Sequence, residues 1–227
     1  QALRINLNTL LRHGVFNDVT MVDFVAARLG DEQSIRKAKA FPYQLLMAYQ
    51  AAKQEMPVVI SEALQDALEH SLVNVPHLAG KKVVVCPDVS GSMQSPATGF
   101  RKGATTSVRC IDVAGLVAAA MLRSNPETIV LPFENQVVDI RLNGRDSVMT
   151  NAKRLANIGG GGTNCSAPLA WLNKHKTAVD VVIFVSDNES WLDNRRQGAS
   201  ETMKQWAEVK RRNPQAKLVC VDIQPNT

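Results

Sequence analysis

An acidic side chain and two hydroxyls follow directly after an apolar segment, and this arrangement constrains the fold more than any other feature of the chain. Residues 81–87 read Lys-Lys-Val-Val-Val-Cys-Pro, and residues 88–92 read Asp-Val-Ser-Gly-Ser. An apolar run of this length is typical of a strand that is buried in a parallel sheet. Open α/β sheets bind their ligands beyond the carboxyl ends of such strands. We therefore expect an α/β fold with a site at Asp88, Ser90 and Ser92.

The side chains after this strand offer the oxygen donors that hard divalent cations prefer. A second apolar run, residues 181–185, leads to another acid, Asp187. Between the two runs, a glycine-rich loop over residues 159–162 leads to the hydroxyl of Thr163. We predict one site for Mg²⁺ or another divalent cation, with at least one coordination position left for water or for an oxygen of a partner. The predicted ligands are Asp88, Ser90, Ser92, Thr163 and Asp187.

Each of these features also has a simpler interpretation. A single Asp at the end of a strand often caps the following helix, and Ser90 or Ser92 can do the same. A run of glycines is usually only a loop. The three features nevertheless stand at the ends of three expected elements, which favours one shared site over three unrelated ones.

The segment before residue 81 has a helical pattern. Leucines recur on one face of the first expected helix, which is therefore amphipathic, and the following helices have the same character. These helices are expected over residues 1–13, 20–29, 41–53 and 61–71, with a short one capped by Asp31. Helices joined by brief polar turns suit the end of a helical-repeat, HEAT-like array. We expect an all-α segment over residues 1–80 and an α/β domain over residues 81–227.

Strands and helices alternate in the expected α/β domain. Strands are expected over residues 82–87, 128–133, 180–186 and 217–223, and helices over residues 109–123, 146–156, 167–174 and 199–212. This alternation predicts a doubly wound, mostly parallel, Rossmann-like sheet with right-handed crossovers. Residues 136–141 follow the second strand too closely for a crossover, so we expect them to form an antiparallel edge strand.

Composition narrows the setting in which the protein works. A net charge of +5 permits contact with nucleic acid without establishing it. The four cysteines lack C-x-x-C spacing, which argues against a zinc site and favours a reducing compartment, so we expect a cytoplasmic protein. We expect no membrane span, because no apolar stretch approaches about 18 residues. The chain begins with Gln1 and shows no signal peptide, and we expect it to be part of a longer protein.

The motifs together resemble a known family. The Asp88-x-Ser-x-Ser motif, with the later Thr163 and Asp187, is similar to the metal-ion-dependent adhesion site of von Willebrand factor A domains. More narrowly, three motifs resemble the Ro ribonucleoprotein (TROVE-domain) family: P-D-V-S-G-S-M from residue 87, G-G-G-T-N-C-S-A-P from residue 160 and V-S-D-N-E-S from residue 185. Residues 39–49 also resemble the last helical repeats of that family.

The resemblance implies a noncoding-RNA-binding ribonucleoprotein component that acts on Y-type or misfolded RNA in RNA quality control. It implies that the main RNA surface lies on helical repeats upstream of this chain. Arg4 and Arg12 are candidate RNA contacts, although a solvated helix face also explains them. We expect a monomer.

The resemblance also implies that an acidic group of a protein partner completes the coordination of the metal. Asn188 and Glu189, which follow Asp187, are candidates for the rim that faces this partner, or for caps of the next segment. Domains of this class continue through a further strand and helix, which we expect to be absent from a chain that ends at Thr227.

Two other functions compete with this one. An enzyme of phosphoryl transfer would use Asp88 as its nucleophile. However, Ser90 stands where a second acid would be needed, and no P-loop lysine or G-x-S-x-G motif occurs. We therefore expect no enzyme. A scaffolding A domain without an RNA role remains an alternative. Only the helical segment and the motifs after Thr163 and Asp187 argue against it.

Overall fold

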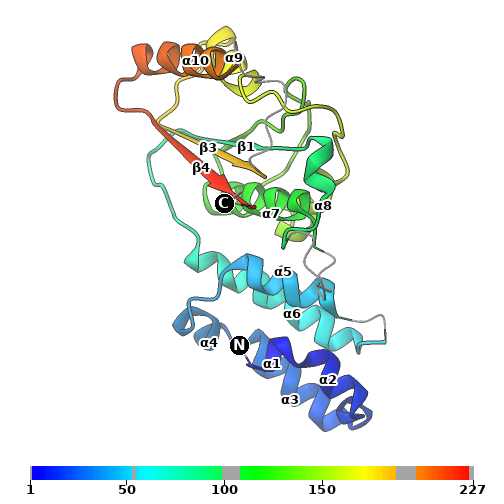
Figure 1. The fold of residues 1–227 in the computed structure, drawn as a ribbon. Helices are drawn as coiled ribbons and strands as arrows, with labels where there is room; N and C mark the ends of the chain where they lie inside the picture. Colours follow the sequence, from blue (N-terminus) through cyan, green and yellow to red (C-terminus); the bar gives the residue numbers. More distant parts are fainter. Residues whose placement is uncertain (1, 53–54, 99–107, 188–197, 225–227) are drawn as a thin grey trace. The chain divides into compact units, whose positions relative to one another are not determined.

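The computed structural model describes residues 2–52, 55–98, 108–187 and 198–224. These residues form two compact units, made mainly of residues 1–76 and 77–227 (Figure 1). The first unit is helical, and the second contains the sheet. None of the helices in the described ranges has the length and apolar character that are needed to cross a membrane.

Short helices with polar caps build the first unit. The helices are α1 Ala2–Ile5, α2 Leu7–Arg12, α3 Val19–Gly30, α4 Glu32–Lys37, α5 Pro42–Ala51 and α6 Val58–Ser71, with 3₁₀ turns η1 Val15–Asn17 and η2 Leu72–Asn74. Asp18 caps α3 by accepting the N–H of Thr20 at 2.8 Å. Asp31 caps α4 as expected, by accepting the N–H of Ser34 at 2.9 Å. These side chains satisfy N–H groups that a helix leaves unpaired at its start.

The first expected helix is in fact two. A single helix over residues 1–13 was predicted, but α1 and α2 are separated at Asn6. The side-chain amide of Asn6 donates to the carbonyl of Ala2 at 2.8 Å. A short amide side chain that bonds the backbone locally competes with the regular helical ladder, which explains the break.

The longest helices of the first unit hold its core. Both α3 and α5 pack against α6. Val25 and Leu29 of α3 and Ile60, Leu64 and Leu68 of α6 are buried. Within each helix they recur at intervals of four residues, so each helix presents one apolar stripe to the other.

The second unit has the predicted doubly wound, parallel sheet. Its strands are β1 Val83–Pro87, β2 Ile129–Val130, β3 Val181–Ser186 and β4 Lys217–Asp222, and its helices are α7 Cys110–Ser124, α8 Val148–Ala156, α9 Ala167–Lys174 and α10 Gly198–Arg212, with a 3₁₀ turn η3 Gly91–Gln94. The strand order is β2-β1-β3-β4, and every pair is parallel. Helices α7 and α8 cover one face of the sheet, and α9 and α10 cover the other (Figure 1).

The central strands are apolar because both of their faces are covered. All of β1 is buried. On the face under α9 and α10, Val84 and Cys86 pack in one apolar cluster with Leu169 and Leu172. This double cover explains why β1 reads as a continuous apolar run and not as an alternating one.

The antiparallel edge strand that we predicted over residues 136–141 does not form. Among the described residues, the antiparallel pairing there is one bridge between Phe133 and Val137. Pro132 has no N–H to offer a partner strand, and its carbonyl accepts the N–H of Val138 at 2.8 Å. The chain therefore turns back after Phe133 without extending the sheet.

Candidate functional site

The two acids that follow the central strands lie at one edge of the sheet. Asp88 follows β1 and Asp187 follows β3, and these strands are parallel neighbours. The N–H of Asp88 donates to the carbonyl of Val185 at 2.9 Å, which continues the strand pairing past Pro87. The exposed fraction is 0% for Asp88 and 3% for Asp187. The parallel register thus places two buried carboxyl groups at the same end of the sheet.

The hydroxyls predicted with Asp88 lie beside it. Its Oδ1 accepts the backbone N–H of Ser90 at 2.9 Å, which forms a local turn. The Oγ atoms of Ser90 and Ser92 lie 3.2 Å apart. The Oδ2 atom of Asp88 accepts the hydroxyl of Ser186 at 2.7 Å. A carboxylate and two hydroxyls of one turn therefore gather at the end of β1.

Backbone hydrogen bonds join the glycine loop to this turn. The N–H of Gly160 donates to the carbonyl of Val89 at 2.9 Å, and the N–H of Gly91 donates to the carbonyl of Gly161 at 2.8 Å. Gly159 and Gly160 have φ values of +82° and +116°, which favour glycine over residues with a side chain. This close approach brings the loop that carries Thr163, itself 1% exposed, against the Asp88 turn.

Burial makes the charge of Asp88 unfavourable in the metal-free protein. It raises the pKa of the Asp88 carboxyl above its ordinary value, and the nearby charge of Asp187 raises the pKa further. Hydrogen bonds from Ser90 and Ser186 oppose this rise. Two buried carboxylates that repel each other are stabilised when a cation lies between them.

The donor set fits a hard divalent cation. In the part of the chain that the structure describes, no three His, Cys, Asp or Glu side chains gather as a metal cluster. The candidate site instead offers two carboxylates together with serine and threonine hydroxyls. Oxygen donors of this kind suit Mg²⁺ or Mn²⁺ and not a thiolate-bound metal such as structural zinc. The predicted rim residues Asn188 and Glu189 lie outside the described residues.

Two further residues of this region are not among those predicted from the sequence. Ser186 bonds Asp88, and the Glu134 carboxylate accepts the N–H of Gly161 in the glycine loop at 2.7 Å. Glu134 directly follows Phe133, the last residue of the second expected strand. The rule that singled out Asp88 and Asp187, an acid at the end of a strand, also applies to Glu134.

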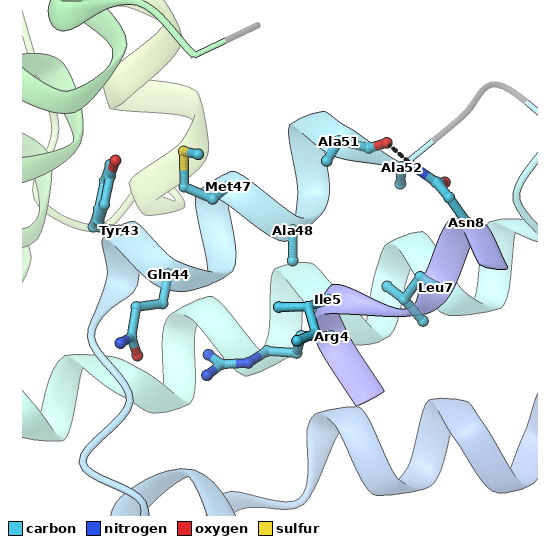
Figure 2. A pocket seen from close by; sticks show the side chains of 10 residues that line it. All are labelled: Arg4, Ile5, Leu7, Asn8, Tyr43, Gln44, Met47, Ala48, Ala51 and Ala52. Atoms are coloured by element: carbon cyan, nitrogen blue, oxygen red, sulfur yellow. Dashed lines mark hydrogen bonds between the residues drawn. The ribbon is translucent and has the colours of Figure 1, made fainter. Parts of the chain in front are cut away.

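The predicted RNA contacts Arg4 and Arg12 differ in their surroundings. Arg12 is exposed and donates to the hydroxyl of Thr9 at 3.3 Å. Arg4 is half-buried, and its Nη1 atom is buried without a hydrogen-bond partner among the described residues. Burial lowers the pKa of the Arg4 guanidinium. Its side chain lines a pocket of about 390 Å³ between α1–α2 and α5, near Gln44 (Figure 2).

The parallel sheet and the D-x-S-x-S, Thr and Asp residues at its carboxyl edge define a domain of the von Willebrand factor A class. Residues 82–226 match the family described as the Ro60 vWA domain, and the chain belongs to this family. The helical unit followed by this domain is the architecture that the family resemblance implied.

The similarity to known proteins covers more of the chain than this domain. The RNA-binding protein RO60 of Deinococcus radiodurans is 28% identical over 209 residues, which cover 82% of this chain and 36% of that protein. The RNA-binding protein RO60 of Caenorhabditis elegans is 24% identical over 184 residues, which cover 77% of this chain and 28% of that protein. The chain thus spans about a third of the length of these curated relatives.

A solved structure shares the fold. The crystal structure of the Deinococcus radiodurans Ro (RSR) protein matches with a TM-score of 0.73 at 24% identity. The match covers 96% of this chain and 45% of that one, so it includes the helical first unit as well as the unit with the sheet.

Proposed function

We propose that this chain is part of an RNA-binding ribonucleoprotein whose A domain binds Mg²⁺ or another divalent cation. An acidic group of a protein partner completes the coordination. One observation carries the metal proposal: the fully buried Asp88 carboxylate is bonded into a turn with two neighbouring serine hydroxyls and lies near a second buried acid. Without a cation this arrangement is electrostatically unfavourable.

Calorimetric titration of the chain with Mg²⁺ and with Mn²⁺ tests this proposal. We expect one saturable site for each chain, because the proposal assigns all five ligands to a single ion. A titration in the presence of acetate, which stands in for the carboxylate of a partner, is expected to show tighter binding of the ion. Absence of any saturable binding would contradict the proposal.

The RNA part of the proposal is supported by the relatives, which are named RNA-binding proteins. We propose Y-type or misfolded noncoding RNA as the ligand, held mainly by helical repeats that precede this segment. Within the chain, Arg4 is better suited to a phosphate than Arg12, because its side chain lines a pocket, whereas Arg12 is exposed and donates to Thr9. A guanidinium held at the wall of a pocket loses less conformational freedom when it pairs with a phosphate than a freely exposed one does.

Arg4→Ala is expected to weaken binding of a labelled single-stranded RNA and to lower its salt dependence. Loss of one phosphate contact reduces the slope of log K against log salt concentration by about 0.7. Fluorescence anisotropy at several salt concentrations measures this slope. Arg12→Ala serves as the matched control and should leave the slope unchanged. An equal change in both variants, or in neither, would refute the preference for Arg4.

We propose a binding module and not an enzyme. Ser90 stands where a phosphoryl-transfer site with an Asp88 nucleophile would need a second acid, and its N–H donates to the Asp88 carboxylate. The chain should therefore release no phosphate from nucleotides or phosphate esters in the presence of Mg²⁺. A colorimetric phosphate assay checks this expectation. A metal-dependent rate that disappears in Asp88→Ala would show catalysis instead.

We also propose a cytoplasmic location, because the four cysteines lack the C-x-x-C spacing of a zinc site and suit a reducing compartment. We further propose that the protein is a monomer.

A further inference from the structure

Glu134 contacts the glycine loop on both sides of Thr163. Its Oε2 atom accepts the N–H of Gly161 at 2.7 Å. Its backbone carbonyl accepts the N–H of Asn164 at 2.8 Å. One residue thus spans the segment from two residues before Thr163 to one residue after it.

The turn that carries Glu134 is itself fixed to the Asp88 segment. The N–H of Phe133 donates to the carbonyl of Pro87 at 3.1 Å, and the N–H of Val89 donates to the carbonyl of Phe133 at 2.9 Å. Phe133 is completely buried, and its ring packs edge-on against Phe184 with centroids 5.5 Å apart. Glu134 therefore stands on a rigid support next to the end of β1.

The carboxylate of Glu134 is the part of this linkage that a substitution can remove. The bonds that join Gly160 and Gly161 to Val89 and Gly91 are formed by backbone groups. The fit around the carboxylate is close: a Cβ atom on Gly161 would lie 2.8 Å from Glu134 Oε2 and 2.5 Å from Asn135 Nδ2. The loop thus approaches Glu134 with no room for a side chain between them.

We propose that Glu134 is a positioning residue of the metal site, which holds the glycine loop so that Thr163 faces the Asp88 turn. This inference rests on the proposed metal binding. A hydrogen bond that fixes a ligand-bearing loop lowers the entropy lost when the metal binds. Loss of such an outer partner typically weakens metal affinity by about ten- to hundredfold.

Three variants test this role by calorimetric titration with Mn²⁺. Glu134→Ala should weaken the affinity by about ten- to hundredfold, because the N–H of Gly161 loses its acceptor. Glu134→Gln should bind like the parent, because the amide oxygen can accept the same N–H. Asp139→Ala removes an exposed acid five positions further on and should leave the affinity unchanged. Parent-like affinity of Glu134→Ala would overturn the proposal. Equal weakness of Glu134→Ala and Glu134→Gln would show that the carboxylate acts by its charge, which also overturns it.

Amide hydrogen exchange in the metal-free protein gives an independent measurement. In Glu134→Ala, the amide of Gly161 should exchange faster than in the parent, whereas in Glu134→Gln it should not. The amide of Asn164 is the internal reference, since its acceptor is the backbone carbonyl of Glu134 and stays in place. If the parent binds no metal, the proposed function fails, and the Gly161 exchange rate still decides whether Glu134 holds the loop. Unchanged exchange in Glu134→Ala would refute the positioning role.

Discussion

The Asp88→Ala variant is expected to show no rise in melting temperature when Mg²⁺ is added. An ion that binds only the folded state stabilises it by about 2.7 kcal/mol when its free concentration is about a hundred times Kd. For a chain of this size, that is a shift of about 5–10 °C in the parent. Asp88 supplies one of the two buried carboxylates of the candidate site and accepts the N–H of Ser90 in the turn that carries the serines, so its loss removes a charged ligand. Thermal denaturation in Mg²⁺ and in EDTA, followed by circular dichroism, measures both shifts.

Asp88→Asn separates the metal effect from damage to the fold. The Asn amide can keep both hydrogen bonds: its oxygen accepts the N–H of Ser90, and its NH₂ donates to Ser186, whose hydroxyl can rotate. In EDTA, this variant should be at least as stable as the parent, because burial and Asp187 disfavour the charged form of Asp88. Its response to Mg²⁺ should nevertheless be strongly reduced. If Asp88→Ala responded to Mg²⁺ as the parent does, the ion would bind elsewhere.

Gly159→Ala is expected to lower the free energy of unfolding of the second unit by about 3 kcal/mol or more. A Cβ atom at this position would lie 2.2 Å from the carbonyl oxygen of Val89, far inside van der Waals contact. The same oxygen accepts the N–H of Gly160, so the loop must move and break this bond. The positive φ of +82° adds strain of about 1–2 kcal/mol for a residue with a side chain. Urea denaturation measures the loss.

Gly80→Ala is the matched control for this substitution. Gly80 has a φ of +69°, close to that of Gly159, but a Cβ atom there would meet nothing within 4 Å. It should therefore lose only the backbone strain of about 1–2 kcal/mol. Similar losses in the two variants would mean that the contact between the glycine loop and Val89 contributes little. Because the displaced loop carries Thr163, Gly159→Ala should also weaken the binding of Mg²⁺.

The order of the secondary structure could be predicted because each pattern is local. The run before Asp88 marks a doubly covered strand by itself, and α9 begins and ends where the sequence predicted it, over Ala167–Lys174. The antiparallel edge strand over residues 136–141 was wrong, because Pro132 and the turn at Phe133 direct the chain away from the sheet. The single helix over residues 1–13 was also wrong, because Asn6 bonds the backbone locally.

The five candidate metal ligands were named from the sequence and stay a prediction, whereas two side chains that bond this region were not named. Ser186 bonds Asp88 across two neighbouring strands, a contact that depends on the pairing of β1 with β3. Glu134 reaches a loop that lies 27 positions further along the chain. Neither contact follows from the spacing of a motif, since both join segments whose proximity is set by the sheet.

By itself, the sequence determined which side chains follow the two central strands, Asp88 with the serines of its turn and Asp187, and that Thr163 follows the glycine loop. It did so because apolar runs and the residues after them are properties of short, contiguous segments. Only the tertiary structure decided that the glycine loop lies against Val89 and Gly91 and that Glu134 holds it there. The reason is physical: parallel strands bring distant loops to one edge, and hydrogen bonds between those loops exist only once the sheet has formed.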